Sequence, residues 1–111
     1  MNEVENFELA TILSMTTWIN LTDNFDKVWK LVWFVMDNSL IGPMGLGMVK
    51  ADIKKHLLTI HPELKGIKFL KGTDVEEFMN EQEEKFGTVL PVTKLGYKLP
   101  EDYKIESGKH I

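Results

Sequence analysis

The strongest hydrophobic pattern in the chain lies between residues 24 and 37. Apolar side chains recur there at the spacing of one helix face, at Phe25, Val28, Trp29, Val32, Trp33 and Met36. Leu31, Phe34 and Val35 occupy the other faces, so the second half of this segment is apolar nearly all round. Such a helix must be enclosed by other elements or by a partner subunit. We therefore expect it to be the central core helix.

Three further helices are predicted around it. The first spans residues 8–17, and we expect Trp18 directly after it to be buried as well. The next spans residues 47–60, with Leu46, Val49, Ile53, Leu57 and Ile60 on its inner face. It ends before His61-Pro62, because a residue preceding proline avoids helical geometry. The last helix follows Thr73-Asp-Val-Glu76, the pattern of a capping box, and ends at Gly87.

The remaining segments are expected to connect these helices. Residues 38–47 are rich in glycine and contain Pro43, which predicts an irregular loop. Residues 67–70 and 89–92 are candidates for a short extended element. The fold class is therefore mainly α: a compact bundle of about four helices around a central hydrophobic helix, with a minor β element. We expect residues 1–95 to form one domain and residues 96–111 a polar, partly ordered tail.

Composition limits the class of protein. The chain has 111 residues, of which 43% are hydrophobic and 27% charged, an ordinary globular balance for one domain. The longest apolar run, residues 31–36, is too short to span a bilayer, and acidic residues stand where a secretory signal has basic ones. The absence of cysteine excludes disulfides and thiolate chemistry. These features predict a cytoplasmic protein without membrane contact.

The charged residues disfavour nucleic acid as a partner. All 13 basic residues are lysine, so the planar guanidinium fork that pairs with phosphate and guanine is missing. The net charge of −4 adds repulsion from a polyanion. A local group of lysines remains the one route to such binding.

No catalytic or metal motif is complete. Gly42 to Gly47 has the glycine spacing of a phosphate loop, but Met48 and Val49 follow where lysine and a hydroxyl residue are required. Asp52 and His56 stand one helical turn apart, yet two ligands do not make a metal site. No serine–histidine–aspartate order is visible. We therefore expect no enzyme activity, no metal and no cofactor.

Two surfaces remain as candidates for binding a partner. The loop at 38–47 carries apolar side chains on a flexible segment, at Leu40, Ile41, Met44 and Leu46. The last helix is crowded with glutamates, among which Glu77, Glu81 and Glu84 are expected on its solvated face. The loop is expected either to pack over the core or to contact another protein. The acidic face is either a simple solvated surface or a contact for a basic partner.

Several segments in this order resemble a known family. They are Leu9–Thr17, Met36-Asp37-Asn38, His56–Leu64 and Phe86–Val92. Together they are similar to a family of small uncharacterised phage and prophage proteins with a single domain of unknown function, over residues 7–95. In that family glycine usually follows the first segment, where Trp18 stands here. The resemblance implies a phage or prophage origin.

The leading functional hypothesis is a non-enzymatic accessory protein that binds a host or phage protein in the bacterial cytoplasm. In one form of this hypothesis, the binding inhibits a bacterial defence system such as a CRISPR effector. The alternative is a structural or assembly protein that forms a homo-oligomer through the apolar helix at 24–37. That alternative rests on the limited number of other elements that could cover this helix.

Overall fold

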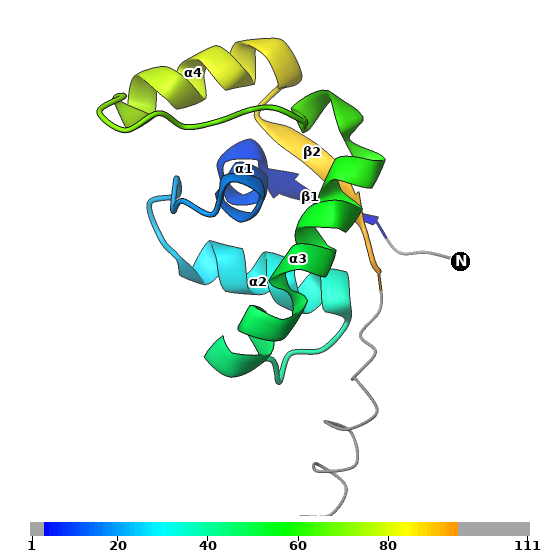
Figure 1. Ribbon diagram of the computed structural model, residues 1–111. Helices are drawn as coiled ribbons and strands as arrows, with labels where there is room; N and C mark the ends of the chain where they lie inside the picture. The colour runs from blue at the N-terminus through cyan, green and yellow to red at the C-terminus, as the bar shows by residue number, and fades with distance from the viewer. Residues whose placement is uncertain (1–3, 96–111) are drawn as a thin grey trace, which may run out of the picture.

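A computed structural model describes residues 4–95 (Figure 1). In chain order the elements are strand β1 (Val4–Glu8), helices α1 (Leu9–Thr17), α2 (Asp26–Met36) and α3 (Pro43–Ile60), a 3-10 turn η1 (Pro62–Leu64), helix α4 (Val75–Phe86) and strand β2 (Val89–Thr93). The prediction of a mainly helical fold with four helices and a small β element is confirmed for these residues. The expected tail at 96–111 lies outside the described residues.

The helix at the centre of the fold is α1. It contacts α2, α3, α4 and β1, and Figure 1 shows it between α4 on one side and α2 on the other. Leu9, Ile12 and Leu13 are fully buried, and Met15 is nearly so. The expectation that the helix around Trp29 and Trp33 forms the centre is not borne out by this arrangement.

Short hydroxyl side chains allow α1 to be buried on most of its surface. Ser14 Oγ donates to the carbonyl oxygen of Ala10 at 2.7 Å and accepts from the backbone N–H of Leu21 at 2.8 Å. Thr17 Oγ1 likewise donates to the carbonyl oxygen of Leu13 at 2.6 Å. Because these hydroxyls find partners on the backbone, their burial carries no unsatisfied polar group.

The end of α1 corrects one prediction about the core. Trp18 adopts a left-handed backbone conformation, with φ of 62°, and its side chain is 50% exposed instead of buried. Its ring lies beneath the ammonium group of Lys50, 4.5 Å from the ring centroid. The left-handed residue turns the chain out of the helix, which carries the indole away from the core.

Helix α2 buries one face and leaves aromatic rings along another. Val28, Leu31 and Val32 are almost completely inaccessible. On the partly exposed face, the rings of Phe25, Trp29 and Trp33 follow one another with centroid separations of 6.3 and 5.9 Å. Trp33 Nε1 donates to the carbonyl oxygen of Ile41 at 3.0 Å, which ties α2 to the segment just before α3.

Helix α3 begins four residues earlier than predicted. The loop expected at 38–47 is shorter, because Pro43 occupies the first turn of the helix. Proline at this position lacks only an N–H that would have no helical partner, and its fixed φ suits a helix. A Cβ on Gly45 would lie 3.1 Å from Ile41 Cγ2, so glycine allows the first turn to approach the preceding residues closely. The inner face from Leu46 to Leu57 is buried as predicted.

The two strands form an antiparallel pair that joins distant parts of the chain. Glu8 pairs with Val89 and Val4 pairs with Thr93. The extended segment near 89–92 was predicted, whereas its partner β1 was not. On the side of α3, His61 Nε2 lies 2.6 Å from the carbonyl oxygen of Pro91, and His56 Nε2 lies 2.9 Å from that of Thr93. As donors to these carbonyls, the two imidazoles fix β2 against α3.

The connection between η1 and α4 is irregular but packed. Residues 67–70 form no strand, although Phe69 meets Phe78 of α4 edge-on with a centroid separation of 5.1 Å. The capping box predicted at Thr73 and Glu76 is also wrong, because Asp74 precedes the helix and no side chain caps it. Gly87 ends α4 with φ of 91°, as predicted.

Candidate functional site

Three apolar side chains are exposed at the start of α3. Leu40 is 91% exposed and Met44 is 87% exposed, while Met48 is 45% exposed. Their spacing of four places Met44 and Met48 on the helix face opposite Leu46 and Val49, which are buried. No charged residue occurs from 38 to 49. We refer to Leu40, Met44 and Met48 as the apolar tip.

The apolar tip is narrower than the surface predicted from the sequence. Leu40 and Met44 are on the surface as expected, but Ile41 and Leu46 belong to the buried core. They are therefore not accessible to a partner in the folded chain, which corrects their assignment as contact residues. Because α3 already begins at Pro43, helical geometry divides this segment into inner and outer residues.

The glutamates proposed on α4 are all exposed. Glu77 and Glu84 lie on the surface, and Glu81 Oε1 is 3.6 Å from the ammonium group of Lys85, one turn further along. An exposed pair of this kind contributes little to stability. Their role in binding stays a prediction.

Other acidic residues line a groove beside α4. Its volume is about 540 Å³. We call it the acidic groove, after its five carboxylate residues, which are Glu8, Asp23, Asp74, Glu76 and Glu83. One cation, Lys27, also lines it. The Lys27 ammonium lies 2.9 Å from Glu8 Oε1 and 2.8 Å from Asp23 Oδ1.

Lys27 changes the ionisation of its neighbours. Its hydrogen bond to Asp23, helped by the opposite charge, lowers the pKa of that carboxyl below its usual 3.8. In return, hydrogen bonds to Asp23 and Glu8 raise the pKa of the lysine above its usual 10.5. Both groups are therefore held in their charged forms at neutral pH, and part of the charge in the acidic groove is neutralised from within.

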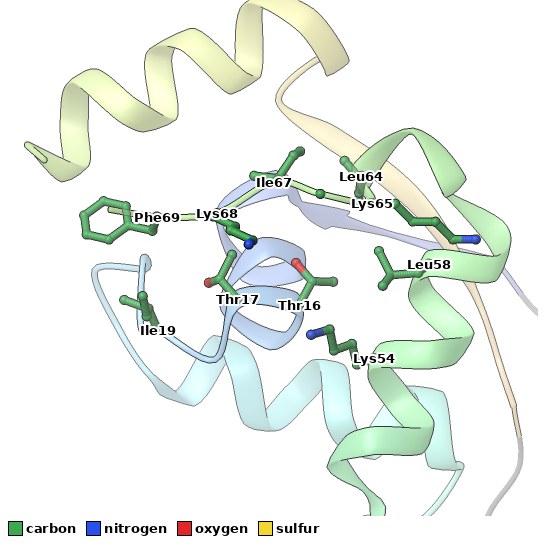
Figure 2. Close-up of a pocket in the computed structure, with 11 residues that line it drawn as sticks. Thr16, Thr17, Ile19, Lys54, Leu58, Leu64, Lys65, Ile67, Lys68 and Phe69 are labelled. Atoms are coloured by element: carbon green, nitrogen blue, oxygen red, sulfur yellow. The ribbon is translucent and has the colours of Figure 1, made fainter. Parts of the chain in front are cut away.

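A second hollow lies between the end of α1, α3 and the segment 64–69 (Figure 2). Its volume is about 410 Å³. We call it the lysine pocket, because Lys54, Lys65 and Lys68 line it together with the hydroxyl residues Thr16 and Thr17. The remaining lining is mainly apolar, from Ile19, Leu58, Leu64, Ile67 and Phe69. In Figure 2 the ammonium groups of Lys54 and Lys68 end near the threonines, whereas that of Lys65 points outward.

Sequence reasoning did not find the lysine pocket. Lys54 comes from α3, while Lys65 and Lys68 come from the irregular connection that begins after η1. The chain turns at Gly66, whose φ of 86° is typical of glycine, and this turn brings the connection over the end of α1. The only signal in the sequence is the even spacing of Lys65, Lys68 and Lys71.

His56 and His61 have structural partners instead of a place in a metal centre. His56 and His61 hold β2 through its carbonyl oxygens. Among residues 4–95 there is no group of three or more His, Cys, Asp or Glu side chains that could hold a metal ion. Asp52 and His56 therefore gain no third ligand within this part of the chain.

No known protein family, curated protein or solved structure matches the chain. Within the described part of the chain, no helix has both the length and the apolar character needed to cross a membrane. The function therefore has to be argued from the surfaces and hollows of the molecule itself.

Proposed function

We propose that this protein acts by binding another protein, and that it inserts the apolar tip into a groove of that partner. The observation that carries the proposal is the exposure of Leu40 and Met44, at 91% and 87%. Large apolar side chains that lie together on the surface, rather than singly, are typical of recognition surfaces.

The chemistry of the apolar tip supports a protein partner. Methionine is flexible and polarisable, so Met44 and Met48 can adapt to the shape of an apolar groove. The absence of charge from 38 to 49 means that burial of this segment removes no ionised group from water. Stable flat interfaces bury about 800 Å² on each partner, more than three side chains provide. This favours a concave partner that surrounds the tip.

The origin and setting of the protein are part of the same proposal. The resemblance to small phage and prophage proteins supports a non-enzymatic accessory protein of the bacterial cytoplasm. Its partner would then be a host or phage protein, with a defence component such as a CRISPR effector as one candidate. Support from the family is an analogy, since fold and origin do not determine activity.

Assembly into a homo-oligomer through α2 has less support. Leu31, Val32 and Val35 are fully covered by other elements of the chain, so the second half of α2 does not need a partner copy. The aromatic rings on the other face of α2, Trp29 and Trp33, are only partly exposed, and Phe25, just before the helix, is 43% exposed. Light scattering tests this alternative directly: a monomer at micromolar concentration would remove it.

The test of the proposed function is a set of affinity purifications from bacterial lysate with matched variants. Leu40→Asp places a charge in the apolar tip, and Leu70→Asp makes the same change at another apolar residue that is 69% exposed. We expect a partner protein that wild type and Leu70→Asp retain and Leu40→Asp loses, followed by the same ranking with the purified partner. Equal retention by all three proteins would contradict the role of the apolar tip. Glu81→Lys with Glu84→Lys tests the acidic face of α4 in the same way.

A further inference from the structure

The lysine pocket has an excess of positive charge that no ion pair within residues 4–95 compensates. None of the described residues that line it is acidic. Lys54, Lys65 and Lys68 form no ion pair with any of the residues 4–95. Other lysines without an ion pair among residues 4–95, such as Lys30 and Lys55, do not line this hollow. A bound anion would supply the missing counter-charge.

The hollow also has an apolar part that a simple anion would not fill. Leu64 is 1% exposed and forms part of its floor, while Ile67 and Phe69 line the side formed by the connection. A volume of about 410 Å³ falls in the range of small-molecule sites, which combine mostly apolar walls with a few placed polar groups. Inorganic phosphate alone would leave these walls in contact with water.

We propose that the lysine pocket binds a small ligand that has an apolar body and a single anionic head group. The head group lies between the ammonium groups of Lys54 and Lys68, beside Thr16 and Thr17, as their arrangement in Figure 2 allows. Each lysine donates hydrogen bonds to the oxygens of the head group. The body of the ligand covers Ile67 and Leu64. This site is separate from the apolar tip and does not depend on the proposed function.

The head group can be a carboxylate or a phosphate monoester, since both present oxygens to ammonium groups. Four probes separate the contributions of charge and body: octanoate, octyl phosphate, 1-octanol and inorganic phosphate. The measurement is the movement of backbone amide signals in an NMR titration of the full chain. We expect saturable shifts at Gly66, Ile67 and Lys68 with octanoate or octyl phosphate. The tighter of the two identifies the head group, and 1-octanol and inorganic phosphate should bind about tenfold more weakly.

Matched variants show whether the lysines carry the binding. Lys54→Glu with Lys68→Glu reverses the charge inside the pocket, whereas Lys55→Glu with Lys71→Glu makes the same change at residues outside its lining. We expect about a tenfold loss of affinity in the first pair and little change in the second. Affinity for the anionic probes should also fall as salt rises toward about 0.5 M, because salt screens exposed charges.

Three outcomes would overturn the proposal. One is binding of 1-octanol as tightly as octanoate, which would mean that the lysines are irrelevant. Another is an equal loss of affinity in both variant pairs, which would reduce the effect to net charge. The third is the absence of saturable shifts at Gly66, Ile67 and Lys68 with all four probes.

Discussion

The acidic groove and the lysine pocket are hollows of similar size with opposite charge. In the acidic groove, Lys27 reaches both Glu8 and Asp23, so the chain itself supplies a counter-charge. In the lysine pocket, Lys54 and Lys68 face hydroxyl groups and apolar side chains, and no carboxylate lines the hollow among the described residues. The net charge of −4 is therefore a sum over local surfaces of opposite charge. Lys27 pairs with two of the five carboxylates of the acidic groove, whereas no carboxylate among residues 4–95 pairs with a lysine of the lysine pocket.

The largest effect should come from the floor of the lysine pocket. Leu64→Ala removes a side chain that is 1% exposed and leaves a cavity. We expect the free energy of unfolding in urea to fall by about 3 kcal/mol. Leu70→Ala is the control, because Leu70 lies on the same connection but is 69% exposed, and its loss should change stability by less than about 0.5 kcal/mol. Similar values for both variants would show that Leu64 is not part of the core.

A smaller effect, a gain in stability, is expected at Trp18, which lies beside the lysine pocket. Trp18 has φ of 62°, and this conformation costs an L-residue about 1–2 kcal/mol. Trp18→Gly relieves that cost but loses the contact with Lys50, so we expect stability to rise by about 0.5 kcal/mol. Asp37 has a similar φ of 54° and accepts a hydrogen bond from Lys94 at 2.8 Å. Asp37→Gly should therefore gain less than Trp18→Gly, and the reverse order in thermal unfolding would contradict this explanation.

In the acidic groove, the contribution of Lys27 to the stability of the fold should depend on pH. The lowered pKa of Asp23 means that this pair stabilises the fold above pH 3.8 and loses that effect as the pH falls further. The raised pKa of Lys27 means that stabilisation is present below pH 10.5 and is lost as the pH rises further. Lys27→Met should thus lower Tm slightly between these limits, and the difference from wild type should vanish beyond both. Lys30→Met, which removes a lysine without an ion pair among residues 4–95, should show no such window.

The smallest effect tests whether the lysines of the pocket repel one another. Lys68→Glu places a carboxylate near Lys54, as Lys27 places an ammonium group among carboxylates in the acidic groove. We expect the free energy of unfolding at low salt to rise by about 0.3 kcal/mol, the size of an exposed ion pair. Lys71→Glu lies outside the lining and should show no gain. A gain of the same size in both variants would mean that only net charge matters.

The sequence predicted the helices better than it predicted the centre of the fold. Apolar spacing located all four helices, but α2 looked more central than α1 because it has more large apolar residues. Burial of α1 depends on Thr11, Ser14 and Thr16, whose residue types suggest exposure. A hydroxyl that donates to a carbonyl of its own helix can be buried, and hydropathy does not record that bond.

The errors at β1 and Pro43 have two different causes. Strand β1 was missed because Phe7 is its only buried side chain and its partner lies some eighty residues further along the chain. A pairing at that separation leaves almost no local signal. Pro43 was taken to interrupt a helix, which holds for a helix interior but not for the first turn. The division of the segment 40–46 into exposed and buried residues depends on where α3 begins, and the lysine pocket depends on tertiary contacts across the connection at 64–69.

The bonds from His56 and His61 also limit how the small sheet can grow. Strand edges with unpaired carbonyl groups are templates for aggregation. On β2 the carbonyl groups of Pro91 and Thr93 are already engaged, and Pro91 has no N–H to offer to an incoming strand. Recruitment of a foreign strand is therefore left to the edge of β1, where the exposed carboxylate of Glu5 would face the like charge of a second copy. The two imidazoles thus occupy carbonyl groups of Val89–Thr93 that an incoming strand would need as acceptors.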